Sequence, residues 1–583
     1  MSMMSKNIRR LLLRILVVAC ALGYCCNAAI ADTATGERWM VATGHPIATD
    51  AAAAVFRDGG NAVDAAVTAA LTLGVVDGNN SGIGGGCLIL IRSADGKLTA
   101  IDGREMAPAA AHKDMFLAGG KPMPDASQTG PLAVGVPGAL AAYKIALERC
   151  GTKELPQLLA PGIKAADEGF IAGGRLARAV RGEAEHLNKY GGARGGLLHD
   201  DGTPIVEGER LVQRDLANTY RAVAEHGVDW FYRGPFAKQV GEWMAANGGI
   251  LTANDFAGYD AKLRPPLLST YRDYTIIGFP PPSSGGVHVA QILNILEQFE
   301  LKHKFENINP AVASHVVIEA FKLAFADRAH WLGDADFVDV PRGLVSKEYA
   351  QQLAAKIGTG PAIEVSSHGT PPNWRQDVFG RHTTHIAAAD ADGNWVAITA
   401  TVNTTFGSKV IVTGTGVVLN NEMDDFSIYP GVPNAFGLVG AENNSVAPGK
   451  RPLSSMSPTI VLNFKREPIL TVGAAGGPKI ITQVVLAIVR QVDLEQSLPD
   501  AVAGPRFHHQ WRPDVVSYEK DLAKGLIDGV RQRGHELQEI DSGGITQAVA
   551  IDGWNRLTGA SGTRGRKLIG VSDPRGYGKA AGE

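Results

Sequence analysis

The sequence has 583 residues, of which 45% are hydrophobic and 20% charged, and its formal net charge at pH 7 is −3. A chain of this length and composition can bury a large core and lacks the polar bias of disordered proteins. Its 70 glycines exceed the average share of about 7%, which predicts a globular protein rich in loops. Because basic residues are scattered and balanced by acidic ones, no nucleic-acid partner is predicted. A small molecule or peptide is the favoured substrate.

Residues 1–31 have the pattern of a secretory signal. Basic residues precede the apolar run 11–22, and small residues lead to Ala31, after which we expect cleavage. The apolar run is shorter than the ~20 residues of a membrane span, so export to the periplasm or the exterior is favoured over a retained membrane anchor. Lipidation at Cys20 is a further alternative, which the nearby Arg14 disfavours.

Only Cys87 and Cys150 remain after that cleavage. An exported chain of this size with two cysteines does not depend on a disulfide framework. We expect buried free thiols, although the sequence leaves a disulfide between them open.

The mature chain is predicted to open with two alanine-rich helices, 51–56 and 62–73, the second capped by Asn61. A glycine loop, 81–86, then leads into an apolar strand, 87–91. A dinucleotide fingerprint needs the opposite order, and no Gly-Lys-Ser/Thr follows, so neither nucleotide motif is present. The glycines are expected to let the backbone turn tightly near a site.

The C-terminal third has a different pattern from the middle of the chain. A helix is predicted over 314–332, and residues 366–375 have the composition of an exposed linker. A β-hairpin follows directly, with strands 383–389 and 395–401 joined by the turn 390–394. Further strands are predicted at 416–419, 459–462 and 470–473, and an apolar helix at 480–492.

A series of motifs covers nearly all of the mature chain and resembles, in order and spacing, the signature of γ-glutamyltransferases. Together these motifs make chance similarity a poor explanation. They are DGREMAP at 102–108, PPSSGG at 281–286, HTTH at 382–385, NTTFG at 403–407, NNEMDDF at 420–426, PGVPN at 430–434, RPLSSMSPT at 451–459, GG at 476–477 and PRFHHQW at 505–511.

The resemblance implies an α+β fold of the N-terminal nucleophile hydrolase type, a four-layer αββα sandwich. It also implies that the precursor cuts itself between His382 and Thr383, which gives a large subunit, 32–382, and a small catalytic subunit, 383–583, that associate as a heterodimer. A threonine hydroxyl needs a neighbouring base, and a freed N-terminal amine of pKa ~7.7–8 provides one within the same residue. Thr401 matches the family threonine whose hydroxyl bonds the nucleophile.

A γ-glutamyl donor carries an α-carboxylate and an α-ammonium, and the pocket must pair both charges. Arg104 suits the carboxylate, because a guanidinium grips it with two prongs. By resemblance, Ser454 and Ser455 assist Arg104. The resemblance assigns the ammonium to Asn403, Glu422 and Asp425.

The tetrahedral intermediate requires donors for its oxyanion, and the backbone amides of Gly476 and Gly477 match the family positions. The loop 430–440 matches a lid over the pocket, with Phe436 where some relatives carry a tyrosine. We expect that lid to close less firmly. Adjacent His508 and His509 diverge and lack zinc-site spacing, so no metal site is predicted. No cofactor is required.

The predicted reaction passes the γ-glutamyl group of glutathione or a related donor to water, an amino acid or a dipeptide. One alternative is a cephalosporin-type acylase that accepts glutaryl groups, for which Asn403, Glu422 and Asp425 would be an uncompensated acidic pocket. The other is an unprocessed scaffold without enzymatic activity. It is suggested by His382, which stands where some close relatives carry glutamine.

Overall fold

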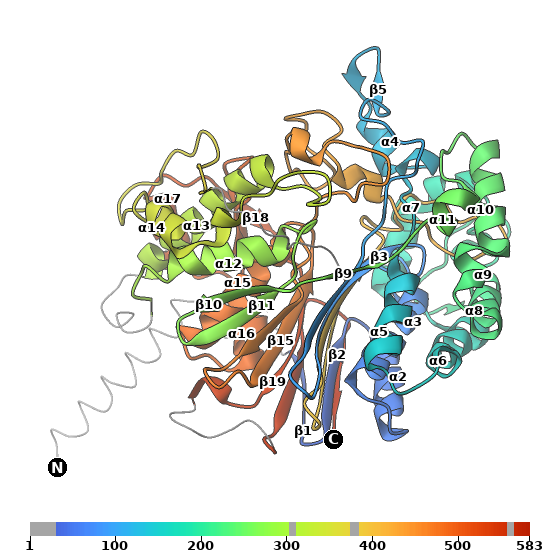
Figure 1. Cartoon of the computed structure of the whole chain (residues 1–583), viewed down its shortest axis with the longest axis horizontal. Coiled ribbons are helices and arrows are strands. Elements are labelled where there is room, and N and C mark those ends of the chain that lie inside the picture. Colours follow the sequence, from blue (N-terminus) through green and yellow to red (C-terminus); the bar gives the residue numbers. More distant parts are fainter. Residues whose placement is uncertain (1–30, 302–309, 373–383, 557–564) are drawn as a thin grey trace.

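The computed structural model describes residues 31–301, 310–372, 384–556 and 565–583. Two seven-stranded antiparallel sheets are stacked face to face, and helices cover the outer face of each (Figure 1). This four-layer arrangement confirms the predicted αββα sandwich. Residues 1–30 of the predicted signal, His382 and Thr383 lie outside the described residues.

The first sheet has the order β1-β20-β19-β15-β14-β11-β10. Its strands are β1 (Asp32–Gly36), β20 (Leu568–Ser572), β19 (Ile545–Ile551), β15 (Pro468–Ala475), β14 (Thr459–Leu462), β11 (Tyr274–Gly278) and β10 (Leu267–Tyr271). The second sheet has the order β21-β2-β12-β13-β3-β4-β9. Its strands are β21 (Lys579–Gly582), β2 (Trp39–Thr43), β12 (Thr384–Asp390), β13 (Trp395–Thr401), β3 (Gly86–Arg92), β4 (Leu98–Gly103) and β9 (Lys262–Arg264).

Helices from distant parts of the chain form the outer layers. The second sheet is covered by α2 (Pro46–Arg57), α3 (Ala62–Val76) and α5 (Ala139–Cys150), and α6 (Leu155–Glu168) and α8 (Arg214–His226) lie outside α3. The first sheet is covered by α12 (Gly285–Leu296), α15 (Lys479–Val492) and α16 (Leu498–Ala503), with α13 (Pro310–Trp331), α14 (Lys347–Ala354) and α17 (Lys524–Arg531) beyond them.

The remaining α-helices and strands of the described chain lie at the periphery. The helices are α4 (Pro124–Gln128), α7 (Gly174–Lys189), α9 (Asp229–Tyr232), α10 (Pro235–Ala246) and α11 (Ala253–Ala257). The strands are β5 (Leu117–Ala118), β6 (Lys121–Pro122), β7 (Phe170–Ile171), β8 (Arg210–Leu211), β16 (Phe507–His508), β17 (Val516–Glu519) and β18 (Leu537–Ile540). No described helix combines the length and apolar character needed to cross a bilayer.

Residue choice explains why the central hairpin β12–β13 lies in the middle of the sandwich. Side chains alternate between the two faces of a strand. Ala387 and Ala389 face the core between the sheets, whereas Ile386 and Ala388 face the core under the helices. Small alanines let the two sheets approach closely. Every residue of both strands is buried, which explains the continuous apolar pattern.

The structure confirms most of the predicted elements. The helices near 51–56, 62–73, 314–332 and 480–492 form, as does the hairpin, and Asn61 caps α3 in a capping box. The predicted strand 416–419 is wrong. Gly416 takes a φ of +64°, and a Cβ on it would lie 2.3 Å from the backbone nitrogen of Leu216, so this segment turns against α8 and makes one isolated bridge.

Both cysteines of the described chain are free thiols, as expected. Cys87 is buried in β3, where burial raises the thiol pKa well above its ordinary value. Cys150 is only half-buried at the end of α5, which differs from the expectation that both thiols are buried.

Candidate active site

A cavity of about 900 Å³ opens where β12 begins and where β13 and β15 end. Five residues predicted for the site line it, together with the first residue of β12, Thr384. These five are Thr401, Asn403, Phe436, Gly476 and Gly477. Thr383, the predicted nucleophile, directly precedes Thr384 in the sequence and lies outside the described residues. The cavity therefore borders the predicted cleavage point.

The end of β13 is held by the glycine loop that precedes β3. A Cβ on Gly85 would lie 1.8 Å from the carbonyl oxygen of Thr401, so only glycine permits this backbone approach. The Thr401 hydroxyl accepts a hydrogen bond of 2.7 Å from the backbone N–H of Asn403, which leaves its own proton to donate. Asn403 has a φ of +78° and donates its side-chain N–H to the carbonyl of Asn421 at 3.0 Å.

Gly476 and Gly477 form the turn between β15 and α15. Their φ values are +138° and +59°, a backbone region that side-chain-bearing residues rarely adopt. The helix α15 begins two residues later, at Lys479, so the turn lies at the positive end of a 14-residue helix. Backbone N–H groups at a helix N-terminus suit a developing negative charge.

Phe436 lies against this turn. A Cβ on Gly477 would be 2.7 Å from Cδ1 of the Phe436 ring, so the ring packs directly on the glycine backbone. The loop around it is organised by Asn434, whose side-chain oxygen accepts from the backbone N–H groups of Phe436 (3.0 Å) and Leu438 (3.1 Å). Asn434 also donates to Asp425 at 3.1 Å, which ties this loop to the acidic turn.

Arg104 belongs to a buried cluster of charges beside the cavity. Its Nη1 contacts Glu422, and also Glu105 at 3.2 Å, and its Nη2 donates to Asp425 at 2.7 Å. The side chains of Arg104, Glu105 and Glu422 are fully buried. Although Arg104 and Glu422 are 318 positions apart in sequence, the fold places them in direct contact.

Burial and charge act in opposite directions in this cluster. Burial disfavours the charged form of Arg104, but Glu422, Glu105 and Asp425 together raise its pKa. Burial also raises the pKa of Glu105 and Glu422, while Arg104 opposes that shift. The side chains of Glu105 and Glu422 also hydrogen-bond each other, and Asp425 interacts with the buried Arg328 as well as with Arg104, so these carboxyl groups do not rely on Arg104 alone.

Arg104, Glu422, Asp425, Ser454 and Ser455 are not among the residues that line the cavity in the described part of the chain. The two serines are fully buried, and the carbonyl of Ser454 accepts from the backbone N–H of Ser284 at 2.9 Å. The cluster connects to the cavity wall through the turn 420–426, since Asn403 bonds Asn421, the residue before Glu422.

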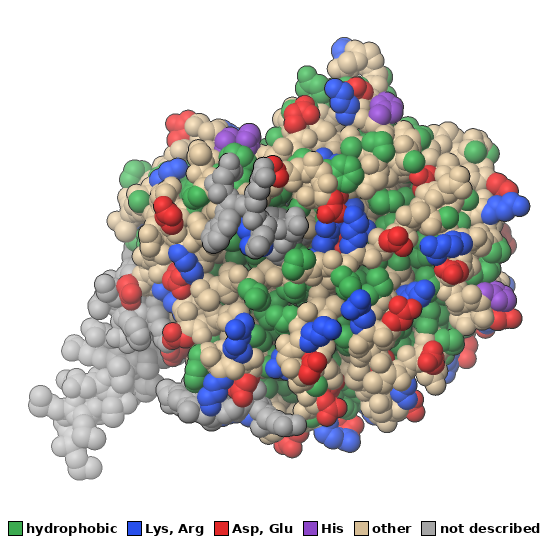
Figure 2. All heavy atoms as spheres, in the orientation of Figure 1, with side chains coloured by type: hydrophobic (Ala, Val, Ile, Leu, Met, Phe, Trp, Pro, Cys, Tyr) green, Lys and Arg blue, Asp and Glu red, His purple; other side chains and the backbone are tan. Residues whose placement is uncertain are grey.

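Several cavity residues escaped the sequence analysis. Arg175 and Arg178, in the first turns of α7, line the cavity and are exposed, and Asp77 lies on the same wall. Burial raises the pKa of Asp77 to about 6, with Arg175 opposing. No motif marked α7, whereas Glu105 could have been found from its place beside Arg104 in the DGREMAP motif. Basic and acidic side chains are interspersed on the face of the molecule shown in Figure 2.

The paired histidines have ordinary hydrogen-bond partners. The His508 ring contacts the Thr482 hydroxyl and the Gln510 side chain, each at 3.0 Å. The His509 ring contacts Asp514, also at 3.0 Å. The two rings are thus engaged with different partners.

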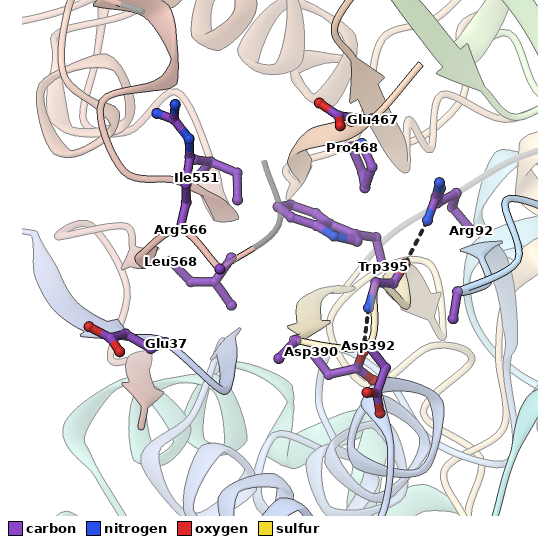
Figure 3. A pocket seen from close by; sticks show the side chains of 14 residues that line it. Glu37, Arg92, Asp390, Asp392, Trp395, Glu467, Pro468, Ile551, Arg566 and Leu568 are labelled. Atoms are coloured by element: carbon purple, nitrogen blue, oxygen red, sulfur yellow. Dashed lines mark hydrogen bonds between the residues drawn. The ribbon is translucent and has the colours of Figure 1, made fainter. Parts of the chain in front are cut away.

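A second cavity, of about 240 Å³, lies at the opposite end of β13. Trp395 is at its centre, with Arg92, Asp392 and Glu467 around it (Figure 3). Trp395 and Thr401 are the first and last residues of β13, and six steps of about 3.3 Å separate them by roughly 20 Å. None of the predicted site residues lines this second cavity, so it is not the site of the predicted chemistry.

The chain is similar to several known proteins in sequence and in structure. The family model for gamma-glutamyltranspeptidase matches residues 48–583. A glutathione hydrolase proenzyme from Escherichia coli strain K12 is 40% identical, with 96% of this chain and 97% of the relative covered. The acylase ACY 1 proenzyme of Pseudomonas sp. strain SE83 is 36% identical, with 91% and 92% covered.

Among solved structures, a cephalosporin acylase from Bacillus halodurans superposes with a TM-score of 0.82 at 27% identity, covering 95% of this chain and 97% of that one. The sequence match extends over more than nine-tenths of the protein, and the structural match covers the same extent. The chain belongs to the γ-glutamyltranspeptidase family.

Proposed function

We propose that this chain is an exported precursor that cuts itself before Thr383 and then acts as a glutathione hydrolase and γ-glutamyltransferase. Export rests on the N-terminal signal pattern. The two products, 32–382 and 383–583, would stay together, because strands from both are interleaved in both sheets. In the second sheet, β12 and β13 of the small subunit lie between β2 and β3 of the large one.

In this proposal, the Thr383 hydroxyl first attacks the carbonyl carbon of His382, and the amide C–N bond between the two residues breaks, which frees the Thr383 amine and leaves an ester. Water then hydrolyses that ester, which releases His382 as a carboxylate and restores the Thr383 hydroxyl. That amine then takes the hydroxyl proton as the oxygen attacks the γ-carbonyl of a donor. The amide C–N bond breaks, the amine leaves with the proton, and a γ-glutamyl ester forms on Thr383. Water, an amino acid or a dipeptide then accepts the acyl group.

One observation carries the proposal: three separate chain segments bring the groups that acyl transfer needs to a single cavity. Thr401 provides a hydroxyl donor from β13, and the turn before α15 provides the N–H groups of Gly476 and Gly477. Thr384, which follows the predicted nucleophile in the sequence, lines the same cavity. Oxyanion donors of this kind contribute about 2.7–4 kcal/mol each to the transition state.

The charged cluster suits a zwitterionic donor. A γ-glutamyl group would place its carboxylate on Arg104 and its ammonium on Glu422 and Asp425. It would therefore replace the internal ion pairs with equivalent external ones and leave no buried charge unpaired. A ligand that lacks the ammonium would pair its carboxylate with Arg104 but would offer no positive charge to Glu422 and Asp425, which Arg104 contacts in the free protein.

The structural likeness to a cephalosporin acylase supports a second candidate function, a glutaryl acylase. The sequence argument against it assumed an uncompensated acidic pocket. The structure weakens that argument, because Arg104 already contacts both acids. What remains of the argument is the α-ammonium, which a γ-glutamyl group offers to Glu422 and Asp425 and a glutaryl group lacks.

Paired substrates test the proposal. γ-Glutamyl-p-nitroanilide and glutaryl-p-nitroanilide differ only in the α-ammonium, so we expect kcat/KM to favour the γ-glutamyl compound by roughly a hundredfold or more, given about 1.5–3 kcal/mol per charged hydrogen bond. A ratio near one, or below one, would favour the acylase. If the protein runs as one uncut chain on a denaturing gel and hydrolyses neither compound, the result would favour the scaffold alternative.

A lid role for Phe436 predicts that its substitutions change the fate of the acyl group. Tyrosine at position 436 would add a hydroxyl, worth about 0.5–1.5 kcal/mol if it bonds Asn403, and should lower KM for the donor by up to about tenfold. Alanine should uncover Gly477 and raise hydrolysis relative to transfer. The measurement is the ratio of hydrolysis to transfer. Identical ratios and KM values in all three proteins would make Phe436 an ordinary packed aromatic residue.

Arg175 and Arg178 suit the carboxylate at the far end of glutathione, the part released as the leaving group. Both are exposed on the cavity wall, where a charged contact is worth about 0.2–1 kcal/mol. We expect the double variant Arg175→Gln/Arg178→Gln to raise KM for glutathione two- to tenfold. KM for γ-glutamyl-p-nitroanilide, whose leaving group has no carboxylate, should not change. An equal rise for both substrates would refute this assignment.

A further inference from the structure

Two histidines and a glutamate meet on the outer side of the first sheet, away from the cavity. His315 and Glu319 are four positions apart on α13 and so lie on one face of that helix. His535 comes from the segment that follows α17, which packs against α13 (Figure 1). None of the three lines the catalytic cavity, and the proposed reaction uses none of them.

The three ligand atoms are close to the spacing that a metal ion requires. His315 Nδ1 lies 2.7 Å from His535 Nε2, and Glu319 Oε1 lies 3.5 Å from His535 Nε2 and 3.9 Å from His315 Nδ1. A tetrahedral zinc ion with ligands at about 2.0–2.1 Å would hold them about 3.3 Å apart. Shifts of about 0.6 Å, within the reach of side-chain torsions, would equalise the three separations.

Lys322 and Arg533 place positive charge near the cluster, which opposes a bound cation unless other groups neutralise it. Lys322 lies 3.7 Å from Glu319, but it also contacts Asp514 at 3.1 Å and donates to the carbonyl of Ile363 at 3.0 Å. Lys322 is thus held by groups other than Glu319. His509 contacts the same Asp514, and Arg533 disfavours a charged His315. Glu319 Oε1 accepts from the backbone N–H of Ile363 at 3.1 Å, and its Oε2 is buried without a hydrogen-bond partner among the described residues.

We propose that His315, Glu319 and His535 form a binding site for one zinc ion or a similar divalent transition metal. Two imidazoles and a carboxylate are ligands that zinc accepts, and water would complete a tetrahedral set. The ion replaces the contact between the two rings with two metal–nitrogen bonds, and any proton held by Glu319 leaves to solvent. The exposed loop 358–360 lies beside the cluster, and its Gly358 backbone hydrogen-bonds His315.

The location gives the metal a structural role. His315 and Glu319 lie before residue 382 and His535 lies after it, so the ion would cross-link the two subunits expected from processing. The site itself does not depend on that cleavage, because all three ligands meet in the folded chain. Its failure and the failure of the proposed reaction are therefore separate results.

Metal binding by the full-length protein tests the site. We expect the wild type, dialysed against zinc and then against metal-free buffer, to retain about one equivalent by elemental analysis. The apoprotein should take up one equivalent of Co²⁺ with the visible absorption of a tetrahedral site. A wild type that retains no stoichiometric zinc and shows no such cobalt absorption would overturn the proposal, whatever the variants do.

Variants locate the ion. His535→Gln and Glu319→Gln should each weaken Co²⁺ binding by roughly a hundredfold or more. Even the loss of a residue that only hydrogen-bonds a metal ligand lowers metal affinity by about 10–100-fold. Zinc should raise the Tm of the wild type and leave the Tm of these variants unchanged. His186→Gln is the matched control, because His186 also pairs with a glutamate on its own helix, at 3.1 Å from Glu183, but is exposed. Undiminished binding in both ligand variants would place the metal elsewhere and refute this site.

Discussion

Replacing Thr383 with alanine is expected to leave one uncut chain that turns over no γ-glutamyl substrate. The same hydroxyl would attack His382 during processing and the donor during catalysis, so both functions should be lost together. Loss of a nucleophile that works with its own base costs more than about 10⁴-fold in kcat. A denaturing gel measures processing, and release of p-nitroaniline measures turnover.

Two further substitutions separate the hydroxyl from the shape of the side chain. Thr383→Val keeps the volume and branching of threonine without the hydroxyl, and it should behave like alanine. Thr383→Ser keeps the hydroxyl without the methyl group, and it should retain part of both functions. If the valine variant is cut and turns over substrate normally, another residue is the nucleophile.

The fold was predictable where local pattern and tertiary environment agree. The hairpin β12–β13 follows from two apolar runs around the turn 390–394, and α3 follows from Asn61 and its alanine-rich sequence. The strand expected at 416–419 failed because β-propensity says nothing about the close backbone contact of Gly416 with Leu216. Steric limits set by a distant helix have no local signal.

The candidate site likewise has one part that the local sequence predicts and one part that it does not. The glycine turn at 476–477 can be recognised locally, because it separates an apolar strand from an apolar helix. The contact between Arg104 and the acids at 422 and 425 cannot, since over 300 residues separate them and each alone resembles a surface charge. The sequence assigned these residues to opposite ends of a donor. Their direct contact became visible only in the folded chain.

The contacts of Arg104 with Glu422 and Asp425 allow a more specific prediction for Arg104→Lys. Lysine keeps the positive charge that three carboxyl groups need, so the variant should fold and cut itself. It cannot hold two partners with a planar fork, as Arg104 holds Glu422 and Asp425. Losing one or two charged hydrogen bonds of about 1.5–3 kcal/mol should raise KM for γ-glutamyl-p-nitroanilide by roughly ten- to a hundredfold or more.

Arg264→Lys provides the matched control, because Arg264 also joins two acids, Asp102 at 3.1 Å and Asp336 at 2.6 Å, without lining the cavity. It should lose stability comparable to Arg104→Lys and keep the wild-type KM. Arg104→Met is the opposite case, since it removes the guanidinium that contacts Glu105, Glu422 and Asp425. It should cost about 3–5 kcal/mol of stability and impair processing as well as binding. If Arg104→Lys is cut normally and keeps a wild-type KM, the guanidinium serves only to neutralise its acidic neighbours, and the donor carboxylate binds elsewhere.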